Sequence, residues 1–283
     1  MAYSHEQSKE KIRAALQKET IAVSALFFVL GMVFASWASR IPAIRDSALL
    51  LPATLGYALL ARGIGSVIML PITIVIISKI GARTASLFFG VLLILSLLPM
   101  ALSPNWWVLS FALIFAGGAG GGFNLSINSL GSGLEGRLGM PKMSTIHSWF
   151  GVGTLAGAIL GTAAASIAIT PLIHFAGIST TMAGVLIVAF RYIPNIMSNT
   201  IVAKHTIYKP KPAILWLGVM IFLAATAEAS IMNWVALFFS DFLQASESIA
   251  PIGYATYAAP DFAFQFIKAF NRGSHAALTI QFL

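Results

Sequence analysis

Long apolar segments follow one another along most of the chain, and each is long enough to cross a lipid bilayer. A helix needs about 20 mostly apolar residues to span the ~30 Å hydrocarbon core. Seven such segments precede Leu243, and an eighth begins near Ser248 and is interrupted at Pro260. Only 9% of the 283 residues are charged and 58% are hydrophobic, whereas soluble domains carry about 25% charged residues. We therefore predict an integral membrane protein.

The pattern favours helices over a membrane β-barrel. Backbone groups in lipid must hydrogen-bond internally, which leaves helices or a closed barrel, and the apolar runs lack the period-two alternation of barrel strands. The predicted fold class is an all-α integral membrane protein with about seven to eight spans. The spans are expected at 21–38, 53–77, 84–102, 106–127, 143–169, 172–190 and 213–239, with the eighth from Ser248.

Lysine and arginine gather on one side of the predicted topology, which sets the expected orientation. The basic side carries Lys9, Lys11, Arg13, Lys18, Lys79, Arg83, Arg137, Lys142, Arg191, Lys204, Lys209 and Lys211. The opposite connections offer Arg40 and Arg45. Because short cytoplasmic loops are enriched in Lys and Arg, we expect a cytoplasmic N-terminus. The net charge of +8 is then an orientation signal, and no nucleic-acid partner is expected.

A polar, basic connection after six spans suggests how the chain is divided. We expect a cytoplasmic tail (1–20), a six-helix bundle (21–190), a central cytoplasmic loop (191–212) and the start of a second bundle with spans seven and eight (213–259). The segment 260–283 has no span pattern and is predicted to be an atypical, out-of-frame or prematurely stopped tail. Six plus six spans is a common transporter plan.

Three ionisable residues within or beside the spans are candidates for a solute or ion pathway. Arg62 lies about ten residues into the second span, roughly 15 Å deep, and Glu228 lies far from either end of the seventh. His147 stands near the start of the fifth. Arg62 could bind an anionic group, Glu228 a proton or cation, and His147 could titrate at a gate. A structural pair between bundles is the alternative for Arg62 and Glu228.

Amides and glycines complete the set of candidates. Asn124 and Asn128 share one helix face and could line a polar pathway or bond a neighbouring helix. Asn233 follows Glu228 by five positions, so the two point to different faces. Small residues at Gly153, Gly157 and Gly161 repeat every four positions, which favours close helix packing.

Catalysis and cofactor binding are not expected. The chain contains no cysteine, which excludes a thiolate metal site or a cysteine nucleophile. We find neither a cluster of metal ligands nor a Gly-x-Ser-x-Gly elbow in the sequence. The prediction is a protein that is not an enzyme and takes no metal or cofactor.

The connection after the second span resembles a known signature. Residues Lys79, Gly81 and Arg83 match or conservatively replace the loop pattern Gly-x-x-x-Asp-Arg-x-Gly-Arg-Arg of the major facilitator superfamily. Ile74 and Ser78 stand where its first Gly and its Asp belong. The stretches 37–46, 143–147 and 228–234 resemble the bacterial inner-membrane MosC-like group associated with rhizopine transport.

The resemblance implies twelve spans, a central cavity between two six-helix bundles, and alternating access. It implies gating roles for the loop motif of Lys79, Gly81 and Arg83 and for Arg40 and Asp46. The group's fourth span typically ends Asp-Val-Ala-Met-Asn and its seventh reads Glu-Gly-Ala-x-x-Asp-Trp. Asn124 and Asn233 replace the two aspartates here, whereas Glu228 is kept.

The expected function is alternating-access transport of a small polar solute across a bacterial inner membrane, with proton coupling as an option. We expect the solute to be sugar-, cyclitol- or organic-anion-like, and transport to be impaired because the chain supplies less than two spans of a second bundle. Two alternatives stay open. One is a non-transporting membrane scaffold or sensor, and the other is one part of a split transporter, completed by a chain that carries the missing helices.

Overall fold

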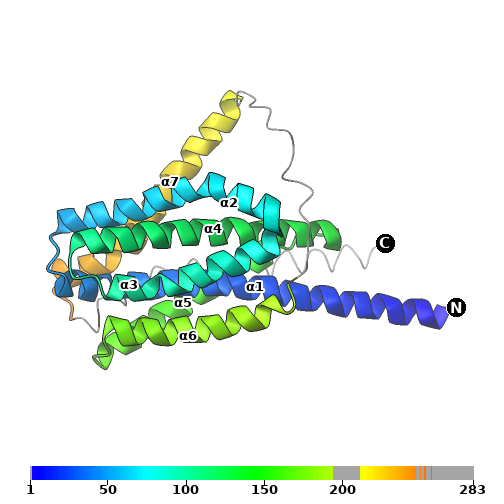
Figure 1. The fold of residues 1–283 in the computed structure, drawn as a ribbon, viewed down its shortest axis with the longest axis horizontal. Coiled ribbons are helices and arrows are strands. Elements are labelled where there is room, and N and C mark those ends of the chain that lie inside the picture. The colour runs from blue at the N-terminus through cyan, green and yellow to red at the C-terminus, as the bar shows by residue number, and fades with distance from the viewer. Residues whose placement is uncertain (1, 194–210, 247–248, 250–251, 253–255, 257–283) are drawn as a thin grey trace.

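A computed structural model describes residues 2–193, 211–246, 249, 252 and 256, and within them every regular element is an α-helix. The helices are α1 (Ala2–Ser47), α2 (Pro52–Leu95), α3 (Leu97–Ala101), α4 (Trp106–Leu138), α5 (Met143–Ser166), α6 (Pro171–Phe190) and α7 (Pro212–Asp241). Figure 1 shows α1 to α6 side by side as an elongated bundle, with α7 leaning away from it at one end. The predicted eighth span and the segment 260–283 lie almost wholly outside the described residues.

The first helix is much longer than the predicted span. Helix α1 holds 46 residues, or ~70 Å at 1.5 Å per residue, and its N-terminal part projects beyond the bundle (Figure 1). Between Ala22 and Ile44 most of its side chains are buried, including Phe27 and Trp37. The same helix therefore forms the centre of the bundle and a polar extension outside it.

Helix α2 contains two of the predicted spans because it folds back on itself at Gly81. Gly81 has φ 79° and ψ 156°, a non-helical conformation inside the element. Residues that carry a Cβ rarely adopt this backbone conformation. Figure 1 shows the two limbs running in opposite directions from this point. Six of the described helices are long and apolar enough to cross a membrane, and the 50-residue stretch Pro52–Ala101 is one of them. Folded in two, it accounts for the second and third predicted spans.

Glycines let the helices of the bundle approach backbone to backbone. A Cβ at Gly31 would lie 2.2 Å from the carbonyl oxygen of Phe150, and one at Gly153 would lie 2.3 Å from that of Phe28. Helices α1 and α5 therefore pack through glycine on both sides. Helices α2 and α4 do the same at Gly65 and Gly117, where a Cβ would lie 2.1 Å from Ile114 O and 1.9 Å from Arg62 O.

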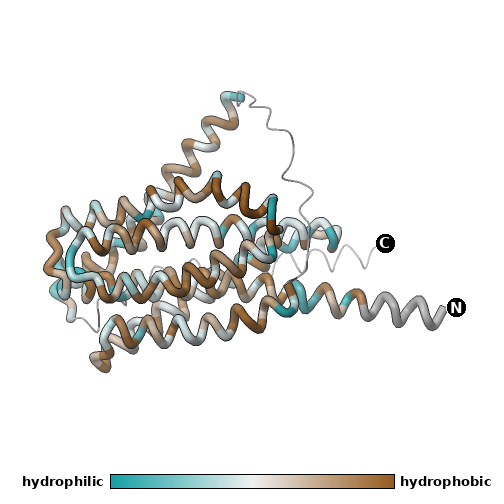
Figure 2. The backbone as a smooth tube through the Cα atoms, in the orientation of Figure 1, coloured by the Kyte–Doolittle hydropathy of each residue, from teal (hydrophilic) through white to brown (hydrophobic). Residues whose placement is uncertain are grey.

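Polar side chains secure the ends of several helices. Asn105 Oδ1 accepts a hydrogen bond from the Val108 amide at the start of α4, and Glu135 Oε1 accepts from the amides of Lys142 and Met143 at the start of α5. Glu135 therefore satisfies amides that a helix start leaves unpaired. Figure 2 shows hydrophilic residues at several helix ends and on the part of α1 just outside the bundle.

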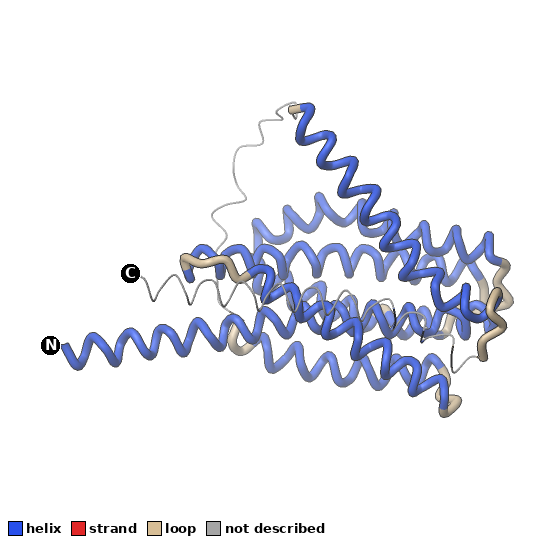
Figure 3. Tube along the Cα trace, turned by 180° about the vertical axis from the view of Figure 1, so that it is seen from behind, coloured by secondary structure: helices blue, strands red, loops and turns tan. Residues whose placement is uncertain are grey.

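Helix α7 contacts the bundle through its C-terminal part alone. Its residues from Pro212 to Ile231 are exposed, whereas Ala236 and Leu237 are buried. Met232 and Val235 pack against a small cluster formed by Ala35, Ala38 and Ala158. Figure 3 shows α7 crossing the bundle obliquely, its C-terminal end near the other helices and its N-terminal end well away from them. The contact is therefore at one end of the bundle.

Candidate functional site

A cleft of about 330 Å³ lies where α1, α2, α4 and α7 meet. Its walls hold both polar and small side chains. They are Phe34, Ala38, Leu59, Arg62, Gly63, Ser66, Ala116, Gly117, Gly120, Gly121, Asn124, Ala229, Met232 and Asn233. Of the six residues predicted for a solute or ion pathway, Arg62, Asn124 and Asn233 thus come together from three different helices.

Arg62 supplies the cationic group of the cleft. Its guanidinium carbon lies 4.4 Å from the centre of the Phe34 ring, which is a cation–π contact between α2 and α1. Such a contact contributes about 0.5–2 kcal/mol, more where water is excluded. The backbone of Arg62 is also confined. Gly117 on α4 packs so closely against the Arg62 carbonyl group that a Cβ at Gly117 would not fit. The charge is therefore held at a fixed place in the wall.

Helix α4 contributes amides to one side of the cleft. Asn124 lines it, and Asn128 lies one turn further along the same face and donates from Nδ2 to the Asn124 carbonyl oxygen at 2.8 Å. A second hydrogen bond joins the two side chains. Asn128 thus holds the Asn124 side chain from outside the cleft. Gly120 and Gly121 keep the wall above Asn124 free of side chains.

Helix α7 contributes Asn233 to the cleft, while Glu228 lies beside it. Asn233 donates from Nδ2 to the Ala229 carbonyl oxygen at 2.7 Å, which leaves its side-chain oxygen to accept. Ala229 and Met232 line the cleft next to it. Glu228 is exposed and absent from the lining, but it stands one helical turn from Met232 on the same face. Of the two polar residues, Asn233 therefore lines the cleft and Glu228 lies beside it.

His147 lies outside the cleft but connects to it through aromatic rings. The exposed His147 ring lies 5.2 Å from the Phe27 ring and 5.8 Å from the Phe150 ring. Phe150 in turn makes an edge-to-face contact with Phe34, with 6.2 Å between ring centres. Since Phe34 also stacks on Arg62, a continuous set of ring contacts runs from α5 to the charged wall of the cleft.

The loop motif after the second span lies at the fold-back of α2. Gly81 makes the turn, and Lys79 beside it is exposed. Arg83 donates from Nη2 to the Phe190 carbonyl oxygen at 3.0 Å, and its guanidinium stacks on the Phe190 ring at 4.5 Å. The arginine thus binds the C-terminal end of α6, where carbonyl groups lack helical partners. This contact joins the turn to the rest of the bundle.

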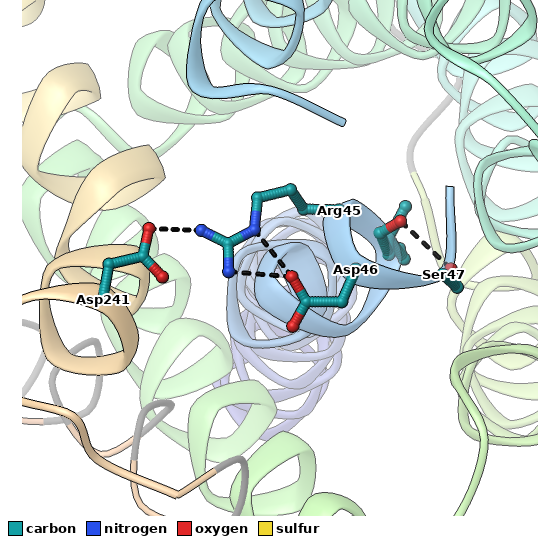
Figure 4. Close-up of polar contacts among 5 residues, drawn as sticks. Arg45, Asp46, Ser47 and Asp241 are labelled. Atoms are coloured by element: carbon teal, nitrogen blue, oxygen red, sulfur yellow. Dashed lines mark hydrogen bonds and ion pairs between the residues drawn. The ribbon is translucent and has the colours of Figure 1, made fainter. Parts of the chain in front are cut away.

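Arg40 and Asp46, predicted in a connection between spans, both lie within α1. Arg40 is 2% exposed and donates from Nη2 to the Ile169 carbonyl oxygen just beyond the end of α5. Asp46 pairs with its neighbour Arg45 at 2.8 Å. Arg45 also forms an ion pair with Asp241 at the end of α7 (Figure 4). The structure thus puts Arg40 in the interior and Asp46 at a contact between two helices.

Sequence reasoning missed Asp241, although one signal pointed to it. Arg45 is one of two basic residues in the connection after the first predicted span, and Asp241 is the acidic residue next to the end of the seventh. Both odd-numbered spans end on the same side of the membrane, so the two charges were candidates for a pair. They flank a second hollow of about 300 Å³, which Trp234, Leu237 and Phe238 also line.

All three glycines that the sequence predicted for helix packing lie on α5 and face α1. Besides Gly153, a Cβ at Gly157 would lie 2.8 Å from both Ala35 Cβ and the Met32 carbonyl oxygen. One at Gly161 would lie 1.9 Å from Ser39 Oγ. Among the described residues, no group of three or more His, Asp or Glu side chains could hold a metal ion.

These features define the class of the protein. It is a multi-pass membrane protein, helical throughout the part that the structure describes, and it shares the fold of the nucleoside transporter NupG, on whose crystal structure it superposes with a TM-score of 0.63. That match covers 90% of this chain and 68% of the other at 16% sequence identity, so it shows the fold. No family model matches the chain.

Three bacterial proteins are similar to this chain in sequence, two of them described as transporters and one as a membrane protein. The chain is 28% identical over 240 residues to an uncharacterised MFS-type transporter of Yersinia pestis, covering 85% of this chain and 62% of the relative. It is 27% identical over 239 residues to the uncharacterised transporter y4wD of Sinorhizobium fredii, with 84% and 63% covered. The membrane protein MosC of Rhizobium meliloti is 24% identical over 245 residues, with 83% and 58% covered.

The chain is therefore similar in sequence to bacterial transporters, one of them of the MFS type, as the sequence motifs predicted, and these two relatives are described as transporters rather than enzymes. It spans about three fifths of the length of these relatives, between 58% and 63%.

Proposed function

We propose that this chain forms the solute-binding wall of an alternating-access transporter for a small polar solute. The observation that carries the proposal is the cleft in which Arg62, Asn124 and Asn233 meet from three helices. Polar groups deep in a membrane protein are costly unless they face a partner or a water-filled space. Here a cation and two amides face one space of solute size.

The arrangement of α7 supports access from one end. Its C-terminal part packs on α1 next to the Arg45–Asp241 pair, while residues 212–231 are exposed and lean away from the bundle (Figure 3). In this proposal, the cleft is closed at the end where α1 and α7 finish and open toward the end where α7 begins. Breaking the contact between Arg45 and Asp241 and closing the other end would reverse the access.

The chemistry of the cleft favours an anionic or polyhydroxylated solute. The guanidinium of Arg62 presents several donors, which suit a carboxylate or vicinal hydroxyl groups. Asn124 and Asn233 each carry both a donor and an acceptor, which suits a sugar or cyclitol. Phe34 and Met232 give an apolar surface for a ring face. Glu228, beside the cleft, is the group that we propose for proton or cation coupling.

Topology and location follow the charge pattern. We propose that the end of the bundle with the projecting part of α1, the fold-back of α2 and the end of α4 faces the cytoplasm, in a bacterial inner membrane. We call it the basic end. We further propose that residues 21–190 form one bundle, that residues 191–212 connect it to a second, and that residues 213–259 begin that second bundle.

A binding screen tests the proposal directly. The purified full chain in neutral detergent is heated with individual sugars, cyclitols and organic anions, and the unfolding midpoint is recorded. We expect at least one of these solutes to raise the midpoint for the wild-type chain and to have no effect on the variant R62Q. The matched control R191Q removes an arginine outside the cleft and should respond as wild type does.

Two results would contradict the proposal. No stabilisation of the wild-type chain by any of the three solute classes would favour a scaffold or sensor. An equal response from R62Q and the wild-type chain would mean that the solute binds somewhere other than the cleft.

A further inference from the structure

A third hollow, of about 560 Å³, lies on the surface of the bundle between α1 and α6. It is separate from the solute cleft and has different walls. On α1 it is bordered by Lys18, Ile21, Ala22 and Ala25, which are spaced so that they share one face of the helix. On the other side its border runs along α6 from Gly184 to Ala189 and ends at Tyr192, just beyond the helix. The two stripes form a groove roughly parallel to the helix axes.

The groove has a polar end and an apolar end. Helix α1 starts and α6 finishes at the basic end, so Lys18 and Tyr192 lie at that end, and Ala25 and Gly184 lie deeper in the span. Seven residues separate Lys18 from Ala25, or about 10 Å along a helix. A lysine at one end of ~10 Å of apolar wall suits the shape of a phospholipid. The charged head group of such a lipid lies at the membrane interface, and its acyl chain enters the membrane.

Neighbouring charges make the polar end cationic. Glu19, the acidic residue next to Lys18, is turned to the other side of α1, where it forms an ion pair with Arg137 of α4 at 2.5 Å. It therefore does not neutralise Lys18. Arg191, which follows the last residue of α6, is exposed and adds a second positive charge next to Tyr192. A tyrosine at this level suits the membrane interface.

Lipid is the occupant that the surroundings favour. The side chains next to the groove are apolar and exposed, with Ile21 62% and Val188 58% exposed. In a membrane-spanning helix such residues contact acyl chains. We propose that this groove is a binding site for an anionic phospholipid, with the phosphate near Lys18 and Tyr192 and one acyl chain between Ala25 and Gly184.

The test compares lipids on the full chain. Delipidated protein in neutral detergent is titrated with phosphatidylglycerol or phosphatidylcholine, and bound lipid is counted by native mass spectrometry. We expect the wild-type chain to bind phosphatidylglycerol more tightly than phosphatidylcholine. In K18Q the ratio of the two affinities should fall about fivefold, because that is the contribution of one lysine next to an anionic surface. K79Q, which removes an exposed lysine at the fold-back of α2, is the charge control and should keep the preference.

A second pair of variants tests the apolar part without changing any charge. Both Gly184 and Gly177 have open space where a Cβ would lie, so leucine fits on α6 at either position. G184L fills the groove and should lower binding of both lipids, whereas G177L lies outside it and should bind as wild type does. Unchanged lipid preference in K18Q, or equal binding by G184L and G177L, would overturn the proposal. So would full competition by inorganic phosphate, which would indicate a site for a free anion.

Discussion

Arg45 at the end of α1 and Asp241 at the end of α7 form an ion pair between residues 196 positions apart in the sequence (Figure 4). The side chain of Arg45 is 14% exposed and that of Asp241 47% exposed, so water still reaches the pair. Partly exposed pairs of this kind contribute about 0–1 kcal/mol. A contact this weak can hold α7 against the bundle and still open, as the proposed alternating access would require.

The first prediction concerns this pair. D241N should loosen the end of α7 while changing the free energy of unfolding by less than about 1 kcal/mol. Hydrogen exchange should become faster at the C-terminal end of α7 and stay unchanged in α4. D46N is the matched control, because Asp46 contacts the same arginine from within α1. Equal exchange in D241N and the wild-type chain would contradict a holding role for the pair.

The turn at Gly81 should not accept a side chain. Its φ of 79° and ψ of 156° belong to a region that costs other residues about 1–3 kcal/mol. G81A should therefore lower stability by that amount in thermal or denaturant unfolding. Gly136 also has open space around it but no positive φ, so G136A should be neutral or slightly stabilising. A G81A variant as stable as G136A would mean that the fold-back adopts another conformation.

The contact between α1 and α5 should be sensitive to a single methyl group. G153A places a Cβ 2.3 Å from the Phe28 carbonyl oxygen in the present geometry. Because this oxygen belongs to the backbone of α1, it cannot rotate out of the way as a side chain could. We expect a loss of about 1–3 kcal/mol from overpacking. G177A, at an open position on α6, provides the comparison. Equal unfolding midpoints for the two variants would rule out a tight contact at Gly153.

Phe34 should influence solute binding through Arg62. F34L keeps an apolar side chain but removes the cation–π contact at 4.4 Å, worth about 0.5–2 kcal/mol. We expect the affinity for the stabilising solute to fall at least twofold, measured by the dependence of the unfolding midpoint on solute concentration. F88L, which changes an exposed ring on α2, should leave affinity unchanged. An unchanged affinity in F34L would mean that the Phe34 ring does not position Arg62 for solute binding.

Orientation can be read from thiol labelling, because the chain contains no cysteine of its own. M140C lies in the connection between α4 and α5 at the basic end, and L102C lies in the connection before α4 at the other end. An impermeant thiol reagent added to intact cells should label L102C, and M140C only after the cells are broken. The reverse pattern would place the basic end outside.

The sequence predicted the apolar spans well because their length is set by the bilayer rather than by packing. It predicted separate second and third spans, and the break lies at Gly81, where a glycine and two basic residues already indicated a turn. It could not show how far α1 extends, since the polar residues before Ile21 are good helix formers that neither require nor exclude a helix.

Side-chain partners were harder to predict than spans. Hydrophobic periodicity predicts the helix on which Arg62 lies but not the neighbour that it faces, so its contact with Phe34 was not foreseen. Arg40 was expected near the membrane surface, and it is buried because the end of α5 offers a carbonyl group to it. The pairing of Arg45 with Asp241 depends on how α7 leans on the bundle, which no local pattern encodes.

The most direct test of the central claim is the water accessibility of Ser66, which lines the cleft one helical turn from Arg62. In membrane vesicles, an impermeant thiol reagent should react rapidly with S66C from the open side and slowly once the stabilising solute is added. The adjacent V67C variant is the control, because Val67 is 67% exposed and does not line the cleft; we expect it to face acyl chains and to react slowly with or without solute. Equal rates for S66C and V67C, or no protection by solute, would contradict a solute pathway through this cleft.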